Sequence, residues 1–381
     1  MTFLRLMFLL LLSLCWGCGV SDSLKLLSEW SNVRNVLVMR LDNIGDVIMT
    51  SPALRAIKEN LPACRLTLMA SPSGAHAALL LPWIDEVFSW QALWQDLGSL
   101  DFNPQREWQL IQTLRDRHFD AAIIFTSFSQ SPHPPAFLCY LAGISLRLGE
   151  SKQYGNGVLT TEAPAAPDQV HQVERNLRLI EAVGFQVRDR SLSIQFDPDV
   201  EQTALQLLAR HSIVDRPYIL LNPWTSCQSR NYDSLRFAIA AKQLAQQTGM
   251  PIVVTGILKD RDRAQSLLTT LEPHAIDLIG STTLPQLAAL IASAQLVLTN
   301  NTSTMHIADA TRTPSVIMFA GTEYESQWRP RHNLSHLLRH PTACSPCYAF
   351  SCPYQLECLD IPPEDVVAAG LDLLASVQQR A

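Results

Sequence analysis

Short apolar runs alternate with helix-length segments along the chain, and this alternation constrains the fold more than any other feature. Runs such as 35–40 and 121–125 are continuous and rich in branched residues, which is typical of strands buried on both faces of a parallel sheet. Strands that alternate with helices form doubly wound α/β sheets. The first half is expected to contain strands at 35–40, 65–70, 87–90 and 121–125 and helices at 47–60, 74–80 and 106–117.

The second half repeats this architecture without repeating the sequence. A stretch rich in Gly, Pro, Ala and Thr at 151–168 is expected to be a linker or a loop over the cleft. The elements expected after it are the amphipathic helix 171–183, strands 218–221, 252–255, 276–278, 296–299 and 315–319, and helices 233–248, 260–271, 284–292, 303–311 and 363–378. These halves predict two Rossmann-like domains that face each other across a cleft, with ligands outside the carboxyl ends of the strands.

The length of 381 residues supports two domains, because a single core usually stops growing below this size. We divide the chain into an apolar N-terminal segment (1–32), an N-terminal domain (33–170), a C-terminal domain (171–362) and a C-terminal helix (363–381). Hydrophobic residues make up 47% of the chain, which argues against disorder. The net charge of -6 gives no overall attraction to nucleic acid, so no nucleic-acid partner is expected.

The apolar stretch Leu6 to Val20 has two interpretations. Its fifteen residues fall short of the roughly 20 that a spanning helix needs. It is compatible with a helix docked on the membrane face or on the domain surface, and equally with a signal segment or short anchor. The chemistry expected of the candidate loops favours a cytoplasmic protein, and peripheral association with the inner membrane is left open.

The loop after the first expected strand holds the candidate catalytic base. Gly45 permits a tight turn and a close approach to a ligand. Asp46 follows it at the start of a helix, where a carboxylate is placed to accept a proton from a substrate hydroxyl. The alternative is that Asp46 only caps the helix. Asp42 is a weaker candidate for the base, and a solvated loop residue is its favoured interpretation. The segment lacks the Gly-x-Gly-x-x-Gly dinucleotide fingerprint.

A second candidate loop runs from Leu298 to Ala310. Here a strand ends in hydroxyl and amide side chains that open a helix, and the free N–H groups of a helix start suit a diphosphate. The candidate donor-binding residues of this loop are Asn301, Thr302, Ser303, Thr304 and His306. A buried histidine with internal partners is the alternative for His306. Arg230 and Gly256 lie in two further strand-to-helix loops, where a solvated arginine and a plain turn are the alternatives.

The run Arg-Leu-Asp-Asn-Ile-Gly-Asp-Val-Ile-Met-Thr-Ser-Pro-Ala-Leu-Arg-Ala-Ile-Lys, residues 40–58, closely resembles the start of glycosyltransferase family 9, which holds the lipopolysaccharide heptosyltransferases. The resemblance implies a GT-B fold, an ADP-heptose-type donor, inversion at the anomeric carbon and no bound metal or other cofactor. It also implies that Asp46 is the base and that Arg40 matches the family's basic residue at the end of the first strand. Gly45 and Thr50 accompany Arg40 on the acceptor or phosphate side.

The second half resembles the same family with departures at three sites. In the segment that resembles the family's Lys-x-Trp-Pro, Arg230 occupies the position of the lysine that contacts donor phosphate. In Asp-Thr-Gly-x-x-His, Asn301 replaces the aspartate and Ser303 replaces the glycine, while Thr302 and His306 match. In Gly-x-Thr-Asp, Glu323 replaces the aspartate. The change at residue 301 removes a charge, which puts donor identity or turnover in doubt.

Four cysteines, Cys344, Cys347, Cys352 and Cys358, have C-x2-C-x4-C-x5-C spacing. Four thiolates can hold a structural zinc, but the central gap is short for a zinc ribbon. Free or paired structural cysteines, a structural zinc and a redox function are the alternatives. No catalytic metal is expected, because no array of carboxylates and histidines lies nearby in the sequence.

The sequence therefore predicts an inverting glycosyltransferase that moves a heptose or related hexose from a nucleotide-diphosphate sugar to a lipid-linked or glycan acceptor of the cell envelope. Three alternatives remain. The first is a nucleotide-sugar epimerase or hydrolase, and the second is a non-catalytic relative that binds nucleotide sugars or assists envelope assembly. The third is an exported binding protein.

Overall fold

The computed structural model describes residues 28–96, 98–153, 157–211, 213 and 216–379. Most of the apolar segment 1–32, including its stretch Leu6 to Val20, lies outside these residues. Within the described ranges, no helix combines the length and the apolar character needed to cross a membrane.

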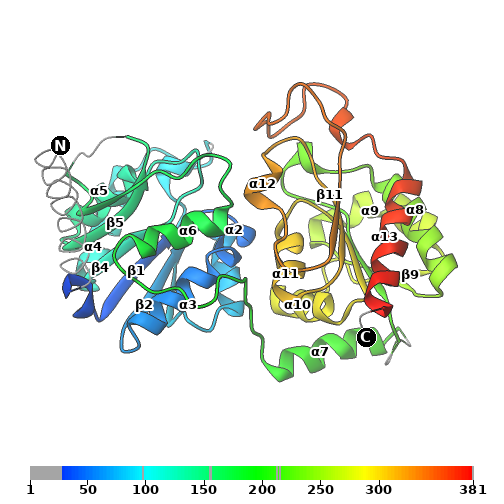
Figure 1. Ribbon diagram of the computed structural model, residues 1–381, viewed down its shortest axis with the longest axis horizontal. Coiled ribbons are helices and arrows are strands. Elements are labelled where there is room, and N and C mark those ends of the chain that lie inside the picture. Colours follow the sequence, from blue (N-terminus) through cyan, green and yellow to red (C-terminus); the bar gives the residue numbers. More distant parts are fainter. Residues whose placement is uncertain (1–27, 97, 154–156, 212, 214–215, 380–381) are drawn as a thin grey trace, which may run out of the picture.

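Two parallel six-stranded sheets form the two halves of the molecule (Figure 1). The strand order is β3-β2-β1-β4-β5-β6 in the first sheet and β12-β11-β10-β7-β8-β9 in the second. Read from β9, the second order is the same as the first, and it is the order of doubly wound Rossmann sheets. The expected α/β fold with two Rossmann-like units is therefore confirmed.

The first sheet is built from apolar runs that lie deep in the fold. Val36, Leu37 and Val38 of β1 are fully buried, because helices cover both faces of the sheet. The elements of this half are β1 (Asn35–Arg40), α2 (Ile44–Ile48), α3 (Ser51–Asn60), β2 (Arg65–Ala70), η1 (Gly74–Leu80), β3 (Glu86–Ser89), η2 (Leu93–Gln95), α4 (Pro104–Asp116), β4 (Ala121–Ile124), α5 (His133–Leu141), β5 (Leu146–Ser151), β6 (Thr161–Pro164) and α6 (Gln172–Glu181).

The second half follows the same plan. Its elements are α7 (Pro198–Ala209), β7 (Ile219–Asn222), η3 (Gln228–Arg230), α8 (Ser234–Thr248), β8 (Ile252–Val254), η4 (Leu258–Asp260), α9 (Arg261–Leu271), β9 (Ala275–Asp277), α10 (Leu284–Ser293), β10 (Leu296–Asn300), α11 (Ser303–Thr311), β11 (Ser315–Met318), α12 (Glu325–Trp328), β12 (Ser335–Leu338), η5 (Glu357–Leu359) and α13 (Pro363–Gln378). The terminal helix α13 packs against α8.

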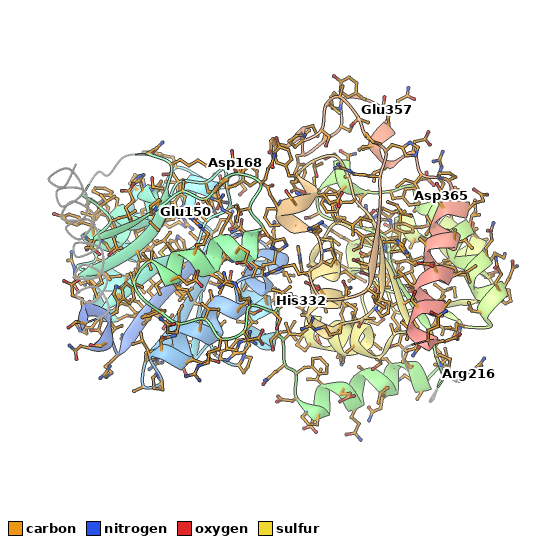
Figure 2. The ribbon with its side chains drawn as sticks, in the orientation of Figure 1. Glu150, Asp168, Arg216, His332, Glu357 and Asp365 are labelled. Atoms are coloured by element: carbon orange, nitrogen blue, oxygen red, sulfur yellow. The ribbon has the colours of Figure 1, made fainter. Side chains whose placement is uncertain are left out.

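Two details differ from the sequence-based expectation. The stretch 151–168 is not only a linker, because it contains β6, which pairs with β5 at the edge of the first sheet. Helix α6 packs against α3 and β5 of the first half, although the expected boundary at 171 placed it in the second. Glu150 at the end of β5 (Figure 2) forms a buried ion pair with Arg175 of α6 and ties this helix to the first sheet.

The chain crosses from one half to the other between α6 and α7, since α7 packs on α10. The halves also touch directly, where α2 meets α11 and η1 meets α10. One apolar cluster runs through this contact and includes Leu80 of η1 together with Ile291 and Ile307 of the second half. The two carboxyl-terminal sheet edges are thereby held facing each other.

Candidate active site in the interdomain cleft

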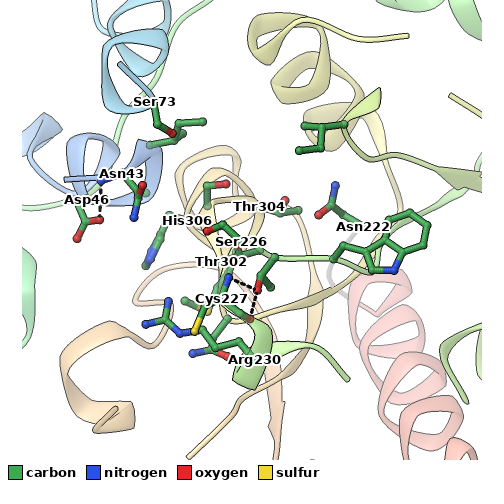
Figure 3. Close-up of a pocket in the computed structure, with 18 of the residues that line it drawn as sticks. Asn43, Asp46, Ser73, Asn222, Ser226, Cys227, Arg230, Thr302, Thr304 and His306 are labelled. Atoms are coloured by element: carbon green, nitrogen blue, oxygen red, sulfur yellow. Dashed lines mark hydrogen bonds between the residues drawn. The ribbon is translucent and has the colours of Figure 1, made fainter. Parts of the chain in front are cut away.

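A cavity of about 950 Å³ lies between the halves and is lined by residues of both (Figure 3). The loops that follow β1, β4, β7 and β10 supply much of its lining. These four strands are the central pairs of the two sheets, where the strand order reverses and where doubly wound folds bind their ligands. The cavity is therefore placed where such a fold normally holds a substrate.

Asp46 faces this cavity from the first turn of α2. Its Oδ2 accepts a hydrogen bond from the backbone N–H of Asn43 at 3.2 Å, so the carboxylate also satisfies the helix start. The other oxygen, Oδ1, lies 3.0 Å from Nη2 of Arg40. The two interpretations of Asp46 are thus compatible, because one oxygen serves the helix while the side chain remains 17% exposed toward the cavity.

Arg40 lies beneath the loop and is fully buried, so it does not line the cavity. Its Nε is 3.1 Å from Oδ2 of Asp42, and its Nη2 donates to Ser127 Oγ at 3.0 Å. One guanidinium therefore balances two carboxylates. Burial raises the pKa of Asp42, although the charge of Arg40 acts in the opposite direction. The expectation that Asp42 is a solvated loop residue is wrong, because its side chain is only 13% exposed.

Thr50 and Gly45 support the loop in different ways. Thr50 is fully buried outside the cavity lining, and its Oγ1 donates to the backbone oxygen of Asp46 at 2.9 Å. It therefore fixes the turn between α2 and α3 and does not face a ligand. Gly45 lines the cavity and lies against the ring of His306 from the opposite half.

The opposite wall is the loop that leads into α11. All five residues expected there line the cavity, namely Asn301, Thr302, Ser303, Thr304 and His306. Helix α11 begins at Ser303, so its first N–H groups lie at the cavity wall. Burial lowers the pKa of His306 to about 4, which keeps the imidazole neutral near pH 7. His306 is therefore buried and also lines the cavity, but its ring has no hydrogen-bond partner among the described residues, so the expected internal partners are not found.

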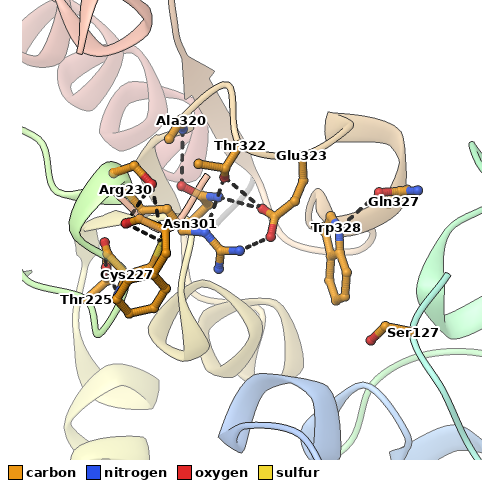
Figure 4. A network of polar contacts seen from close by, with 12 residues as sticks. Ser127, Thr225, Cys227, Arg230, Asn301, Ala320, Thr322, Glu323, Gln327 and Trp328 are labelled. Carbon is orange, nitrogen blue, oxygen red and sulfur yellow. Dashed lines mark hydrogen bonds and ion pairs between the residues drawn. The ribbon is translucent and has the colours of Figure 1, made fainter. Parts of the chain in front are cut away.

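Arg230 belongs to a polar network in this wall (Figure 4). Its Nε donates to Thr322 Oγ1 at 3.2 Å, and its Nη2 pairs with Glu323. Asn301 also reaches Glu323, through Nδ2 and Oε2 at 3.2 Å. A fully solvated arginine is therefore not what the structure shows, since Thr322 and Glu323 both hold Arg230, whose side chain is 30% exposed.

The wall around Gly256 differs in character. A Cβ at Gly256 would lie 3.2 Å from the ring of Trp224, so the backbone passes close to this side chain. Arg263 also lies over this ring, with its Cζ 5.1 Å from the ring centre. Trp224 and Arg263 both line the cavity. Sequence reasoning missed them, although Trp224 follows a strand within an already singled-out loop.

The loop that carries the cysteines covers one side of the cavity, where Tyr348 and Phe350 join the lining. Tyr348 packs against Phe128 of the first half, with ring centres 5.3 Å apart. All four cysteines of the loop are free thiols. Across the described ranges, no three potential ligands among His, Cys, Asp and Glu gather around a point that could hold a metal.

Comparison with known proteins adds three findings. The family model described as "Glycosyltransferase family 9 (heptosyltransferase)" matches residues 107–357. Lipopolysaccharide heptosyltransferase 3 of Escherichia coli K12 is 25% identical over 290 residues, which cover 75% of this chain and 82% of the relative. Lipopolysaccharide heptosyltransferase 2 of the same organism is 25% identical over 300 residues, covering 74% and 82%.

Two solved structures share the fold. The family 9 glycosyltransferase of Veillonella parvula has a TM-score of 0.73 at 18% identity, covering 90% of this chain and 97% of that one. The ADP-heptose lipopolysaccharide heptosyltransferase II of Escherichia coli has a TM-score of 0.70 at 22% identity, covering 91% and 100%. These similarities confirm the GT-B arrangement of the two sheets.

Proposed function

Since the chain belongs to glycosyltransferase family 9 and is a heptosyltransferase-like glycosyltransferase, we propose that it transfers a heptose or related hexose from an ADP-linked donor to a lipopolysaccharide-type acceptor. The names of the relatives support the sugar and the acceptor class. The observation that carries the proposal is the placement of Asp46 across the cavity from the start of α11. A base and a diphosphate-suited helix start then face the same space.

The proposed reaction is a single displacement. Asp46 accepts the proton of an acceptor hydroxyl while that oxygen forms a bond to the anomeric carbon of the donor sugar. The bond between this carbon and the diphosphate oxygen breaks, and its electron pair leaves with the nucleoside diphosphate. Attack from the face opposite the leaving group inverts the anomeric centre. Asp46 later releases its proton to solvent.

Charge on the leaving diphosphate is stabilised by groups of the second half. The N–H groups at the start of α11 point toward the cavity, and Arg230 adds a guanidinium beside them. The helix start supplies positive potential, and Arg230 offers hydrogen-bond donors although its charge is shared with Glu323, so we propose a metal-independent reaction. A cytosolic nucleotide sugar also favours a cytoplasmic location, at the inner face of the membrane where a lipid-linked acceptor is reached.

The test is transfer from ADP-heptose to a series of lipopolysaccharides truncated at successive inner-core sugars, with and without EDTA. Wild-type protein is expected to glycosylate one member of the series, and Asp46→Asn is expected to lose about 100- to 10,000-fold in kcat. Transfer by Asp46→Asn at the wild-type rate would remove Asp46 from its role. Donor binding without transfer to any acceptor would favour a non-catalytic protein, and donor turnover without acceptor would favour a hydrolase or epimerase.

A further inference from the structure

Three of the residues at which this chain departs from its family pattern are Arg230, Asn301 and Glu323, and Glu323 contacts the other two (Figure 4). Arg230 pairs with Glu323, and Asn301 donates its Nδ2 hydrogen to Oε2 of Glu323 at 3.2 Å. They come from three separate loops, yet all three line the cavity next to Thr302 and Ser303. Their departures from the pattern therefore meet at one point beside the expected diphosphate position.

The environment of Asn301 explains why an amide stands there. Its Oδ1 accepts a hydrogen bond from the backbone N–H of Ala320 at 3.1 Å, while its Nδ2 donates to Glu323. Asn301 is 3% exposed and Glu323 is 9% exposed. An aspartate at position 301 would place a second carboxylate against Glu323 in this buried setting, where like charges repel strongly. Glutamate at 323 and aspartate at 301 are therefore mutually unfavourable.

The geometry of Arg230 explains why a guanidinium stands in place of an ammonium. Nε is used by Thr322 and Nη2 by Glu323, while Nη1 makes no hydrogen bond to the described residues. A planar guanidinium can thus hold Glu323 with one edge and still present N–H groups to a phosphate. A lysine ammonium is a single point charge and lacks this fork. Without Arg230, the carboxylate of Glu323 would face the incoming diphosphate uncompensated.

We propose that Arg230, Asn301 and Glu323 act as one donor-positioning unit, in which the carboxylate of Glu323 binds hydroxyl groups of the donor sugar. Arg230 links this carboxylate to the donor diphosphate, and Asn301 holds it in place. This inference rests on the proposed function, because it takes a nucleotide sugar as the ligand. It implies that a single carboxylate, at residue 323, is enough for a functional donor site although residue 301 is uncharged.

The test compares the single variants Arg230→Lys, Asn301→Asp and Glu323→Asp with the triple variant that combines them. Each single change breaks the match among the three side chains, and we expect each to weaken ADP-heptose binding by about tenfold or more. The triple variant is expected to bind ADP-heptose with an affinity within about threefold of wild type, because its three side chains form a different combination in which each again suits the other two. Asn103→Asp, at the exposed cap of α4, is the matched control and should leave binding unchanged.

Calorimetric titrations with ADP and with ADP-heptose separate the two contacts. Glu323→Gln is expected to weaken binding of ADP-heptose several-fold more than binding of ADP, because only the former carries the sugar. Equal losses of affinity for ADP and for ADP-heptose would show that Glu323 does not contact the sugar. If the fold-loss of ADP-heptose affinity in the triple variant equals the product of the three single fold-losses, the three side chains do not act as a coupled unit.

An error in the proposed function gives a different result. Wild-type protein would then not bind ADP-heptose, and the same variants would be titrated with UDP-, GDP- and CDP-sugars instead. Recovery in the triple variant with any of these sugars supports the unit, and additive losses overturn it. Melting temperatures of all variants without ligand identify any that fail to fold. If Asn301→Asp fails to fold, the double variant Asn301→Asp/Glu323→Gln, which again holds a single carboxylate at this point, is titrated in its place.

Discussion

The imidazole ring of His306 lies directly against the backbone of Gly45, across the contact between the two halves. A Cβ placed on Gly45 would lie 2.8 Å from Cδ2 of His306 and 3.4 Å from Cα of Ser303. Gly45 precedes the proposed base, while Ser303 begins the helix that faces the donor. The missing side chain at Gly45 therefore sets how closely base and donor helix approach each other.

We expect Gly45→Ala to lower kcat by about tenfold or more while leaving the melting temperature near its wild-type value. Alanine favours the helical conformation of α2, so the loss would come from separation of the two loops and not from local unfolding. Steady-state transfer kinetics and thermal unfolding check both halves of this expectation. Wild-type kcat in Gly45→Ala would show that the contact does not control the spacing.

The buried guanidinium of Arg40 leads to a prediction about stability. Arg40→Met would leave Asp42 and Asp46 without their shared cation, and we expect a loss on the order of 3 kcal/mol in the free energy of unfolding. The double variant Arg40→Met/Asp42→Asn removes one carboxylate as well and should recover part of that loss. Urea unfolding at pH 7 measures both. Equal stability of the two variants would contradict the shared role of Arg40.

The central strands and the loops after them were predictable from the sequence, because continuous apolar runs identify buried parallel strands. Two edge strands were missed: β6 and β12 are short and only partly buried, so their sequences lack a strong pattern. The other edge strands, β3 and β9, were expected, whereas the buried strand β5 was missed. Helix α7 was also missed. It lies on the surface of the second half, and only two of its residues, Ala204 and Leu208, are buried.

The contacts within the site depended on the fold. The sequence indicated Asp46, Arg230 and the loop into α11, because each follows a strand. It could not show that Glu323 reaches Arg230, since 93 residues separate them in the chain. The burial of Asp42 was likewise hidden, because it results from Arg40 beneath it and from Gln130 of a different loop.

The aromatic contact between Phe128 and Tyr348 leads to a prediction about the acceptor. Phe128 follows Ser127, which hydrogen-bonds Arg40 beside the proposed base, so these rings lie on the acceptor side of the cavity. Aromatic faces pack well against the apolar faces of sugar rings. We expect Phe128→Ala to raise the acceptor KM by about fivefold and to leave donor affinity unchanged. Tyr348→Phe keeps the ring and is the control; an unchanged KM in Phe128→Ala would argue against this subsite.

The cysteine loop yields a prediction about metal removal. Because no three potential ligands gather within the described residues, we expect prolonged treatment with a strong chelator to leave the melting temperature unchanged. Serine at Cys344, the exposed member of the four, should be equally neutral. A structural zinc would behave differently, since its loss usually unfolds the surrounding segment. A large fall in melting temperature, with zinc or iron released into the dialysate, would contradict the expectation.

Burial of His306 gives the stability of the protein a pH dependence of known sign. Burial lowers the pKa of His306 to about 4 in the folded protein, whereas an unfolded histidine titrates near 6.5. Between these values the unfolded chain binds a proton that the folded chain does not. The free energy of unfolding should therefore fall as the pH falls from about 6.5 to about 4, by up to about 1.4 kcal/mol per pH unit. His171, whose pKa burial also lowers to about 4, acts in the same direction.

His306→Gln isolates the contribution of this residue. Glutamine does not titrate, so we expect the variant to lose less stability than the wild type between pH 7 and pH 5, whatever its stability at pH 7. Urea unfolding at both pH values gives the difference, and the effect of the carboxylates, which titrate mainly below this range, largely cancels in the comparison. His340→Gln, at an exposed position, controls for loss of a histidine as such. An identical pH dependence in wild type and His306→Gln would mean that His306 is protonated in the folded cleft, which would add a positive charge beside Asp46.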